Sequence, residues 1–250
     1  MKTIKNTLLA AALLAGQIAF SQETATRQLS SFSKVQLSGT FDVVLEQGNA
    51  NTAKIEVQGI DPSKIITEVE GDALNVYMEK GEYHHFKAKV YITYKTLQAI
   101  NKSGTGDLVS KSPLSASEFN LNSSGSGNIH FESKIKTPAL SLRNSGSGNI
   151  KINGIEADNA ELAFSGSGNI ELGAGYAKKE SIQLSGSGNV DADDIKAETC
   201  TAALSGSGNI NVNVSNSLEG RIAGSGNITY EGDAQVKKLG IIGSGKISKK

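Results

Sequence analysis

Three glutamates and an arginine are the residues of this sequence that could cleave a polysaccharide. Glycosidic hydrolysis needs two carboxyl groups that converge on one bond, the first as acid and the second as base or nucleophile. Glu161, Glu171, Glu180 and Arg143 fall on different copies of a repeat and share no register within it. No pair is marked for acid–base chemistry, so we predict no catalytic residue.

Calcium is the metal that a glycine-rich repeat first suggests, because nonapeptide β-rolls hold it through a recurring Asp. Here the repeat is about 20 residues long, and only Asp107 is acidic at a position that is otherwise mostly Asn. Asp191, Asp193 and Asp194 form a local acidic cluster, which we interpret as a solvated turn. A hard dication prefers several carboxylates, so we predict no metal site and no cofactor.

The histidine pair and the single cysteine are the other candidates for chemistry. Adjacent strand residues point to opposite faces, so His84 and His85 could not ligate one metal together, and we interpret both as surface residues. Cys200 aligns with Ala160 of an earlier repeat, at a position that the alternation of apolar residues places inside. We therefore predict a small buried thiol rather than a nucleophile. The Gly-x-Gly phrases lack the strand–turn–helix context of a nucleotide site.

The phrase Ser-Gly-Ser-Gly-Asn-Ile organises most of the chain. Five close and three weaker copies have their first glycine at positions 104, 125, 146, 166, 186, 206, 224 and 243, in steps of 18 to 21 residues. Such a period predicts a solenoid, in which each coil buries its apolar side against its neighbours.

Apolar residues recur at fixed places in each repeat. Those three residues before the phrase are Ile100, Leu121, Leu142, Leu162, Ile182 and Ala202. After the phrase, alternation such as Ile150-Lys151-Ile152 predicts short strands with one buried face. The sequence therefore predicts an all-β fold in which coils of about 20 residues stack into long parallel sheets.

The phrase itself predicts a tight corner between strands. Its glycines meet either a positive φ or a close approach to the neighbouring coils, which a Cβ would obstruct. Stacked amides predict a hydrogen-bonded Asn ladder, formed by Asn128, Asn149, Asn169, Asn189, Asn209 and Asn227. The serines of the phrase can form a parallel ladder of hydroxyls in the same way.

Residues 22–100 lack the phrase but keep β-like alternation, and residues 101–250 carry the repeats. We predict that the first segment is an irregular N-terminal β layer that covers the open end of the solenoid, because repeat arrays need such caps. Both segments would form one continuous domain. The segment Asp61–Ile65 predicts a single helical turn. Lys246, Lys249 and Lys250 place charge on the last coil, which discourages end-to-end stacking.

The first 21 residues predict a secretory signal peptide. Lys2 and Lys5 precede an apolar run from Leu8 to Phe20, and small side chains at Ala19 and Ser21 suit cleavage before residue 22. The run is too short to span a bilayer, which takes about 20 residues. We therefore expect an exported, non-membrane-spanning chain in the periplasm, on the outer surface or outside the cell.

The charge balance restricts the partners. The chain has 25 basic and 25 acidic residues, and removal of Lys2 and Lys5 leaves a net charge of 23 − 25 = −2. A nearly neutral surface argues against nucleic acid, which requires a basic face. One cysteine excludes an intramolecular disulfide, so stability must come from stacking and hydrogen bonds.

The chain resembles the auto-transporter adhesin head GIN domain family, a domain of unknown function in exported proteins of Bacteroidota. The resemblance rests on the stretch from Phe32 to Val43, on Gly-Asp-Ala-Leu-Asn-Val at 71–76 and on the repeated Gly-Asn-Ile. It covers nearly all of the chain after residue 21. The resemblance implies a right-handed parallel β-helix-like fold and an adhesive role, and brings no catalytic residue with it.

Three functions are compatible with these observations. The first is an exported, non-enzymatic, adhesin-like module that binds glycans or cell-surface proteins through its wall, where rows of polar side chains suit multivalent contact. The ligand-binding residues stay undefined at this stage. A purely structural envelope protein explains the same rows, and a carbohydrate-active β-helix enzyme is the third alternative.

Overall fold

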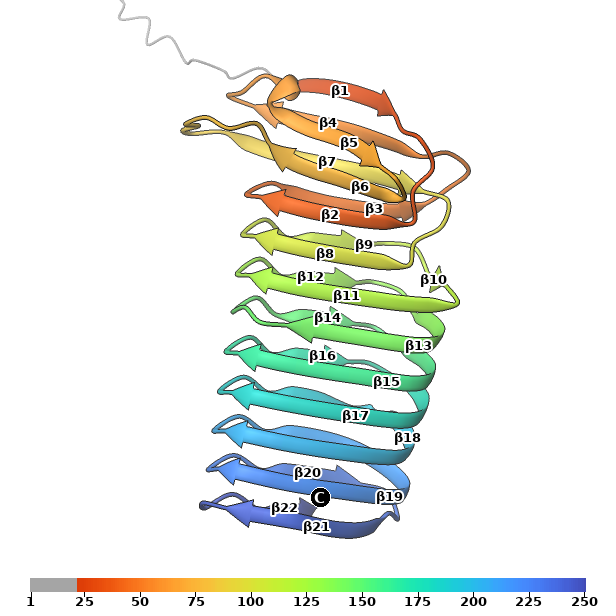
Figure 1. The fold of residues 1–250 in the computed structure, drawn as a ribbon, viewed down its shortest axis with the longest axis vertical. Helices are drawn as coiled ribbons and strands as arrows, with labels where there is room; N and C mark the ends of the chain where they lie inside the picture. The colour runs from red at the N-terminus through yellow and green to blue at the C-terminus, as the bar shows by residue number, and fades with distance from the viewer. Residues whose placement is uncertain (1–21) are drawn as a thin grey trace, which may run out of the picture.

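The computed structural model describes residues 22–250, and most of them lie in β-strands. The predicted signal peptide, residues 1–21, lies outside the described residues. The strands wind into a right-handed parallel solenoid whose coils stack in a single column (Figure 1). This arrangement confirms the predicted fold class.

The upper end of the column is the irregular layer that the sequence predicts. Its strands are β1 (Glu23–Gln28), β4 (Thr52–Gln58), β5 (Ile65–Glu70), β6 (Ala73–Met78) and β7 (Lys87–Tyr94). The pairs β1–β4, β4–β7 and β5–β6 are antiparallel, unlike the rest of the fold. A 3₁₀ turn at Pro62–Lys64 confirms the predicted helical turn, and Asp61 caps it by accepting a 2.7 Å hydrogen bond from the Ser63 amide.

The N-terminal segment also supplies the first coil of the solenoid. Strand β2 (Lys34–Gly39) pairs in parallel with β8 (Ala99–Gly104), and β3 (Asp42–Gln47) pairs in parallel with β9 (Leu108–Ser110). The irregular layer therefore continues into the repeats through main-chain hydrogen bonds.

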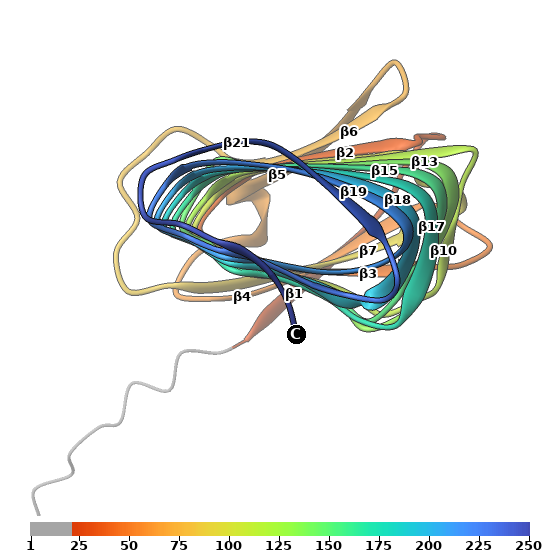
Figure 2. The same cartoon turned by 90° about the horizontal axis from the view of Figure 1, so that it is seen from below.

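The repeats below this coil have one long wall and shorter strands behind it. Their strands are β10 (Leu114–Ser115), β11 (Glu118–Gly125), β12 (Ile129–Phe131), β13 (Ile135–Asn144), β14 (Ile150–Ile152), β15 (Ile155–Gly166), β16 (Ile170–Leu172), β17 (Gly175–Gly186), β18 (Val190–Gly206), β19 (Ile210–Gly224), β20 (Ile228–Glu231), β21 (Gln235–Ile242) and β22 (Ile247–Lys249). We call the sheet formed by β6, β2, β8, β11, β13, β15, β17, β18, β19 and β21 the long wall. Seen along the stack, the coils overlie one another, and the β5–β6 hairpin projects beyond their outline (Figure 2).

The core consists of apolar columns that run along the stack. Leu121, Leu142, Leu162 and Ile182 stand opposite one another on successive strands and are fully buried, as the sequence predicts. Burial of each such side chain contributes about 1.5–3 kcal/mol. A coil detached from its neighbours would lose most of this contribution, which explains why the repeats stabilise one another.

The corner glycines are required mainly by close approach. A Cβ on Gly168 would lie 2.1 Å from the carbonyl oxygen of Gly148, and one on Gly166 would lie 2.2 Å from that of Gly146. A positive φ occurs at some of the same positions, such as Gly104 (108°) and Gly186 (137°). The sequence predicts either a positive φ or a close approach between coils, and the close approach is the reason that applies throughout the repeats.

The predicted Asn ladder is confirmed. The side-chain oxygen of Asn128 accepts from the backbone amide of Asn149 (3.1 Å) and from its Nδ2 (3.2 Å), and the pattern recurs between Asn169 and Asn189. The ladder starts at Asp107 and ends at the amide of Lys246.

The predicted serine ladder is wrong for residues 22–250, whose hydrogen bonds include none between two serine hydroxyls of the phrase. Ser103 of the phrase instead donates from its hydroxyl to the Leu37 carbonyl oxygen on the neighbouring strand, at 3.2 Å. Within residues 22–250, the outward hydroxyls of the later repeats make no such bond and stay available to other partners; they belong to Ser124, Ser145, Ser165, Ser185 and Ser205.

Candidate functional site

The residues considered for polysaccharide cleavage do not converge. Arg143 on β13 donates from Nη2 to Glu161 on β15 at 3.2 Å, as an exposed ion pair. Glu171 lies on β16, a different wall, and pairs with Lys151. Glu180 points into the core. Because these carboxylates face different surroundings, they supply no acid–base pair.

Glu180 is a buried carboxyl that the sequence reasoning missed. Its side chain stands between Ala160 and Cys200 in an interior column, and neither carboxyl oxygen has a hydrogen-bond partner in the described part of the chain. Burial raises the pKa of Glu180 from 4.5 to about 8, although the adjoining Cys200 thiol acts in the opposite direction. The spacing of 20 residues to Ala160 and to Cys200 was the available sign of its inward orientation.

Cys200 is buried, as predicted. Burial raises the pKa of its thiol well above the ordinary range, and the neighbouring Glu180 raises it further. A thiol that stays protonated and inaccessible is a poor nucleophile. Cys200 is thus a small core residue.

The acidic cluster at 191–194 lies in a strand and not in a turn, which corrects our interpretation. It falls within β18, where the pairing with β19 shifts register between Ala192 and Lys196, as at a β-bulge. Asp193 accepts a 3.0 Å hydrogen bond from Lys250 Nζ, which holds the pKa of Asp193 below its usual range. Asp191 lies before the shift, in register with Asn211, while Asp193 and Asp194 fall among the residues that the bulge adds.

Asp107 heads the Asn ladder and accepts a 2.7 Å hydrogen bond from the Asn128 amide. Behind the same corner lies Lys102, which is buried and donates to the Gly127 carbonyl oxygen at 3.2 Å. Burial lowers the pKa of Lys102, and the charges of Asp107 and Asp42 oppose this shift. The ammonium group of Lys102 therefore supplies positive charge next to the carboxylates of Asp107 and Asp42. Over residues 22–250, no three His, Cys, Asp or Glu side chains gather as metal ligands would.

His84 and His85 are exposed, as predicted, but they lie in the loop between β6 and β7 and not on a strand. His85 has a φ of 56°, a left-handed conformation. Nothing in their surroundings gives them a chemical role.

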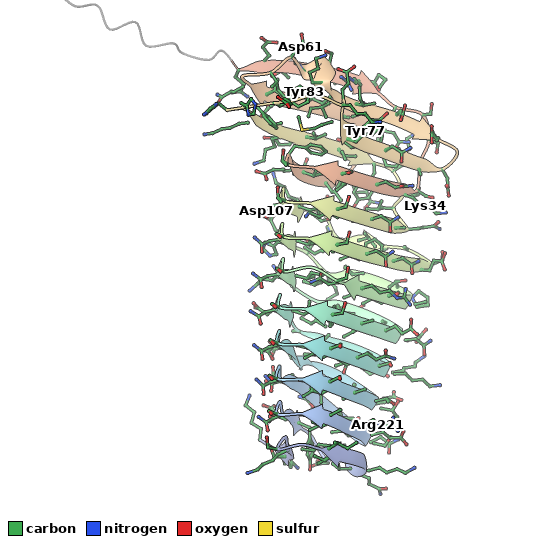
Figure 3. All side chains as sticks on the ribbon, turned by 60° about the vertical axis from the view of Figure 1, so that its left-hand side comes forward. Lys34, Asp61, Tyr77, Tyr83, Asp107 and Arg221 are labelled. Atoms are coloured by element: carbon green, nitrogen blue, oxygen red, sulfur yellow. The ribbon has the colours of Figure 1, made fainter. Side chains whose placement is uncertain are left out.

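The outer face of the long wall carries an open groove of about 1340 Å³. Its lining comes from nine strands, β6 to β19, so at about 4.8 Å per strand it is roughly 38 Å long. We call this surface the wall groove. Figure 3 labels Tyr77 near its upper end and Arg221 near its lower end.

Two columns of outward-facing side chains form the floor of the wall groove. The first consists of Ser38, Ser103, Ser124, Ser145, Ser165, Ser185 and Ser205, with Tyr77 opposite Ser38 at its upper end. The second consists of Asn75, Gln36, Asn101, Asn122, Arg143, Ala163, Gln183, Ala203 and Arg221. The first column is the serine row of the repeated phrase, so the repeat supplies hydroxyl groups at regular intervals along the groove.

The charged residues of the wall groove all have one sign. They are Lys80, Lys102, Arg143 and Arg221, and no Asp or Glu lines it. Lys102 is buried, whereas the other three are exposed. Glu161, the partner of Arg143, and Glu68, which accepts a 2.7 Å hydrogen bond from the Tyr77 hydroxyl, lie beside the groove and outside its lining.

The fold and this surface define a β-solenoid that offers an extended groove on its outer wall. Two overlapping segments, residues 31–154 and 122–234, match the family described as "Putative auto-transporter adhesin, head GIN domain". The chain belongs to this family. No curated protein matches the chain.

Solved structures from the genus Parabacteroides share the whole fold. A "putative adhesin" from Parabacteroides merdae is 25% identical with a TM-score of 0.86, over 92% of this chain and 96% of that one. A "putative adhesin" from Parabacteroides distasonis is 25% identical with a TM-score of 0.87, over 93% and 98%. A "Putative lipid binding protein" from the same species is 30% identical with a TM-score of 0.83, over 92% and 96%.

Residues 22–250 contain no helix that is long and apolar enough to cross a membrane.

Proposed function

We propose that this chain is an exported, non-enzymatic binding module that attaches to surface glycans through the wall groove. The single observation that carries the proposal is the groove itself, a long open surface floored by a serine column and an amide-rich column. Rows of equivalent groups suit several weak contacts with a ligand that is itself repetitive, and such contacts add up through multivalency.

The absence of convergent chemistry supports a binding role over an enzymatic one. Among residues 22–250 the carboxylates weighed for catalysis are paired with cations on different walls or buried in the core. Hydrolysis of a glycosidic bond needs two carboxyl groups within about 5–9.5 Å of each other around one bond. Membership of a family named for adhesins and similarity to two solved putative adhesins point the same way.

A glycan array with the purified chain, run beside a polysaccharide degradation assay, tests the proposal. We expect binding to a subset of glycans and no shortened products. Shortened oligosaccharides would establish an enzyme instead, and silence in both assays would favour a purely structural envelope protein.

Export is tested separately by the N-terminus of the native protein. The charged start, short apolar run and small residues before position 22 support cleavage there. Mass spectrometry of protein from the cell envelope should find a chain that begins at Gln22. A chain in the cytoplasm that still begins with Met1 would contradict export.

A further inference from the structure

We propose that the wall groove takes an elongated anionic glycan, in which carboxylate or sulfate groups recur along the polymer. The inference rests on the proposed function, because it specifies the ligand class for the same surface.

Charge is the first argument for an anionic ligand. Basic and acidic residues are equally numerous in the chain, yet the exposed charged residues of the groove lining, Lys80, Arg143 and Arg221, are all basic. Arg143 and Arg221 belong to one outward column and are separated by Ala163, Gln183 and Ala203. At about 4.8 Å per strand, their strands lie roughly 19 Å apart. The guanidinium groups therefore suit an extended polyanion better than a single small anion.

The hydrogen-bonding state of the sheet argues against an extended peptide as the ligand. The nine strands that line the groove are paired on both sides; β15, for example, pairs with β13 and with β17. A peptide that adds as a strand needs a free sheet edge with unpaired main-chain groups, and the face of the wall has no such edge. Any ligand on this face must be recognised by side chains.

The side chains on offer match a carbohydrate. Hydroxyl and amide groups both donate and accept hydrogen bonds, as sugar hydroxyls do, and they recur along the whole groove. Tyr77 ends the serine column, and an aromatic ring of this kind presents an apolar face beside a polar hydroxyl. The short side chains of Ala163 and Ala203 leave the middle of the groove open, so that a polymer can lie across several coils.

The test compares polymers that differ in charge and chemistry. The purified chain is titrated with polygalacturonate, with neutral dextran, with poly-L-glutamate and with vesicles of anionic phospholipid. We expect polygalacturonate to bind best and its affinity to fall as salt rises from about 0.05 to 0.5 M, because salt screens exposed charges.

A matched pair of substitutions places the ligand in the groove. Ala163→Glu introduces a carboxylate at mid-groove, whereas Ala163→Gln introduces a side chain of the same shape without charge, like that of Gln183 on the next strand. We expect Ala163→Glu to weaken polygalacturonate binding at least about tenfold, and Ala163→Gln to change it by less than about threefold.

Removal of the two arginines gives an independent readout. The double variant Arg143→Gln/Arg221→Gln should bind about tenfold more weakly. Its control, Lys179→Gln/Lys196→Gln, removes as much charge from exposed positions outside the groove lining and should bind as the parent does. Thermal unfolding of each variant verifies that its fold is intact.

Each other outcome overturns the inference in a distinguishable way. Equal, salt-insensitive binding of dextran would reject the anionic class and leave the proposed glycan-binding function standing. Tighter binding of poly-L-glutamate or of vesicles would reject a glycan ligand. Equal effects of Ala163→Glu and Ala163→Gln would show that the polymer binds outside the wall groove. Failure of polygalacturonate while the array shows other glycans would reject only the inference, and failure of every glycan would reject both.

Discussion

Replacement of Glu180 by Gln should make the stability of this protein much less dependent on pH. Glu180 is buried without a hydrogen-bond partner for either oxygen, and its pKa rises from 4.5 to about 8 in the folded chain. Between these two values the folded state keeps a proton that the unfolded state has released. Folding stability therefore falls as pH rises from about 4.5 to about 8, and this contribution is fully present only below 4.5.

The magnitude follows from the size of the pKa shift. Each pH unit across the window corresponds to about 1.4 kcal/mol. The parent should therefore lose about 3 kcal/mol between pH 4.5 and pH 7, and about 5 kcal/mol by pH 9. Gln has a similar shape and no charge at any of these pH values. The free energy of unfolding of Glu180→Gln should therefore equal that of the parent near pH 4.5, and exceed it by about 3 kcal/mol at pH 7 and about 5 kcal/mol at pH 9.

Urea unfolding at about pH 4.5, 7 and 9 measures this difference. The midpoints of parent and variant should coincide at the lowest pH and separate as the pH rises, with an unchanged slope. Glu118→Gln alters an exposed, outward-facing carboxylate and serves as the control. Parallel curves for the parent and Glu180→Gln at all three pH values would refute the reasoning, since they would mean that the carboxyl is hydrated or paired.

Three further predictions concern the corner, the ladder and the thiol. Gly168→Val should destabilise the fold by at least about 1–3 kcal/mol in urea unfolding, because its Cβ would lie 2.1 Å from a carbonyl oxygen. Lys151→Gln, which breaks only an exposed ion pair, should cost less than about 1 kcal/mol, and equal effects of the two changes would contradict the corner geometry. Asn189→Asp should lower the melting temperature at pH 7 and recover near about pH 3, since an ionised carboxylate oxygen would replace the Nδ2 that now donates to the Asn169 side-chain oxygen at 3.1 Å. A variant as stable as the parent at pH 7 would contradict the role of the ladder. Cys200 should react with a thiol reagent only after unfolding, because it is buried and its pKa is raised, and rapid labelling of the folded chain would show that the core opens.

Most of the fold could be predicted because an alignment of the repeats identifies the equivalent residues of successive coils. The column of Leu121, Leu142 and Leu162, the Asn ladder and the inward position of Cys200 all follow from one alignment at a period of about 20 residues. The turn at Pro62–Lys64 could be predicted from local sequence alone, because the capping carboxylate of Asp61 directly precedes Pro62.

The features that escaped prediction depend on contacts outside the repeat or on departures from it. The residue type of Glu180 suggests an exposed side chain, whereas its alignment with Ala160 and Cys200 indicates a buried one. These two small neighbours leave room in the column for a longer side chain. The bulge near Asp193 depends on an insertion whose placement the alternation does not reveal. The serine ladder does not form because a serine hydroxyl can also bond to the main chain, as Ser103 does to the Leu37 carbonyl oxygen, and residue type alone does not show which partner it takes.

The wall groove could be predicted only in part. The serine row is visible in the sequence, but the one-sided charge of the groove needs the strand register that sets Arg143 and Arg221 in one column. Its upper end depends on Tyr77, which belongs to the non-repeating segment and reaches the serine column only through the pairing of β6 with β2.

A crystal structure of the chain with an oligogalacturonate long enough to span the groove tests the central claim most directly. We expect sugar residues along the outer face of the long wall between Tyr77 and Arg221, with their carboxylates beside Arg143 and Arg221. Sugar bound at the shorter strands behind this wall, at the open end of the last coil, or nowhere on the crystallised protein would contradict it.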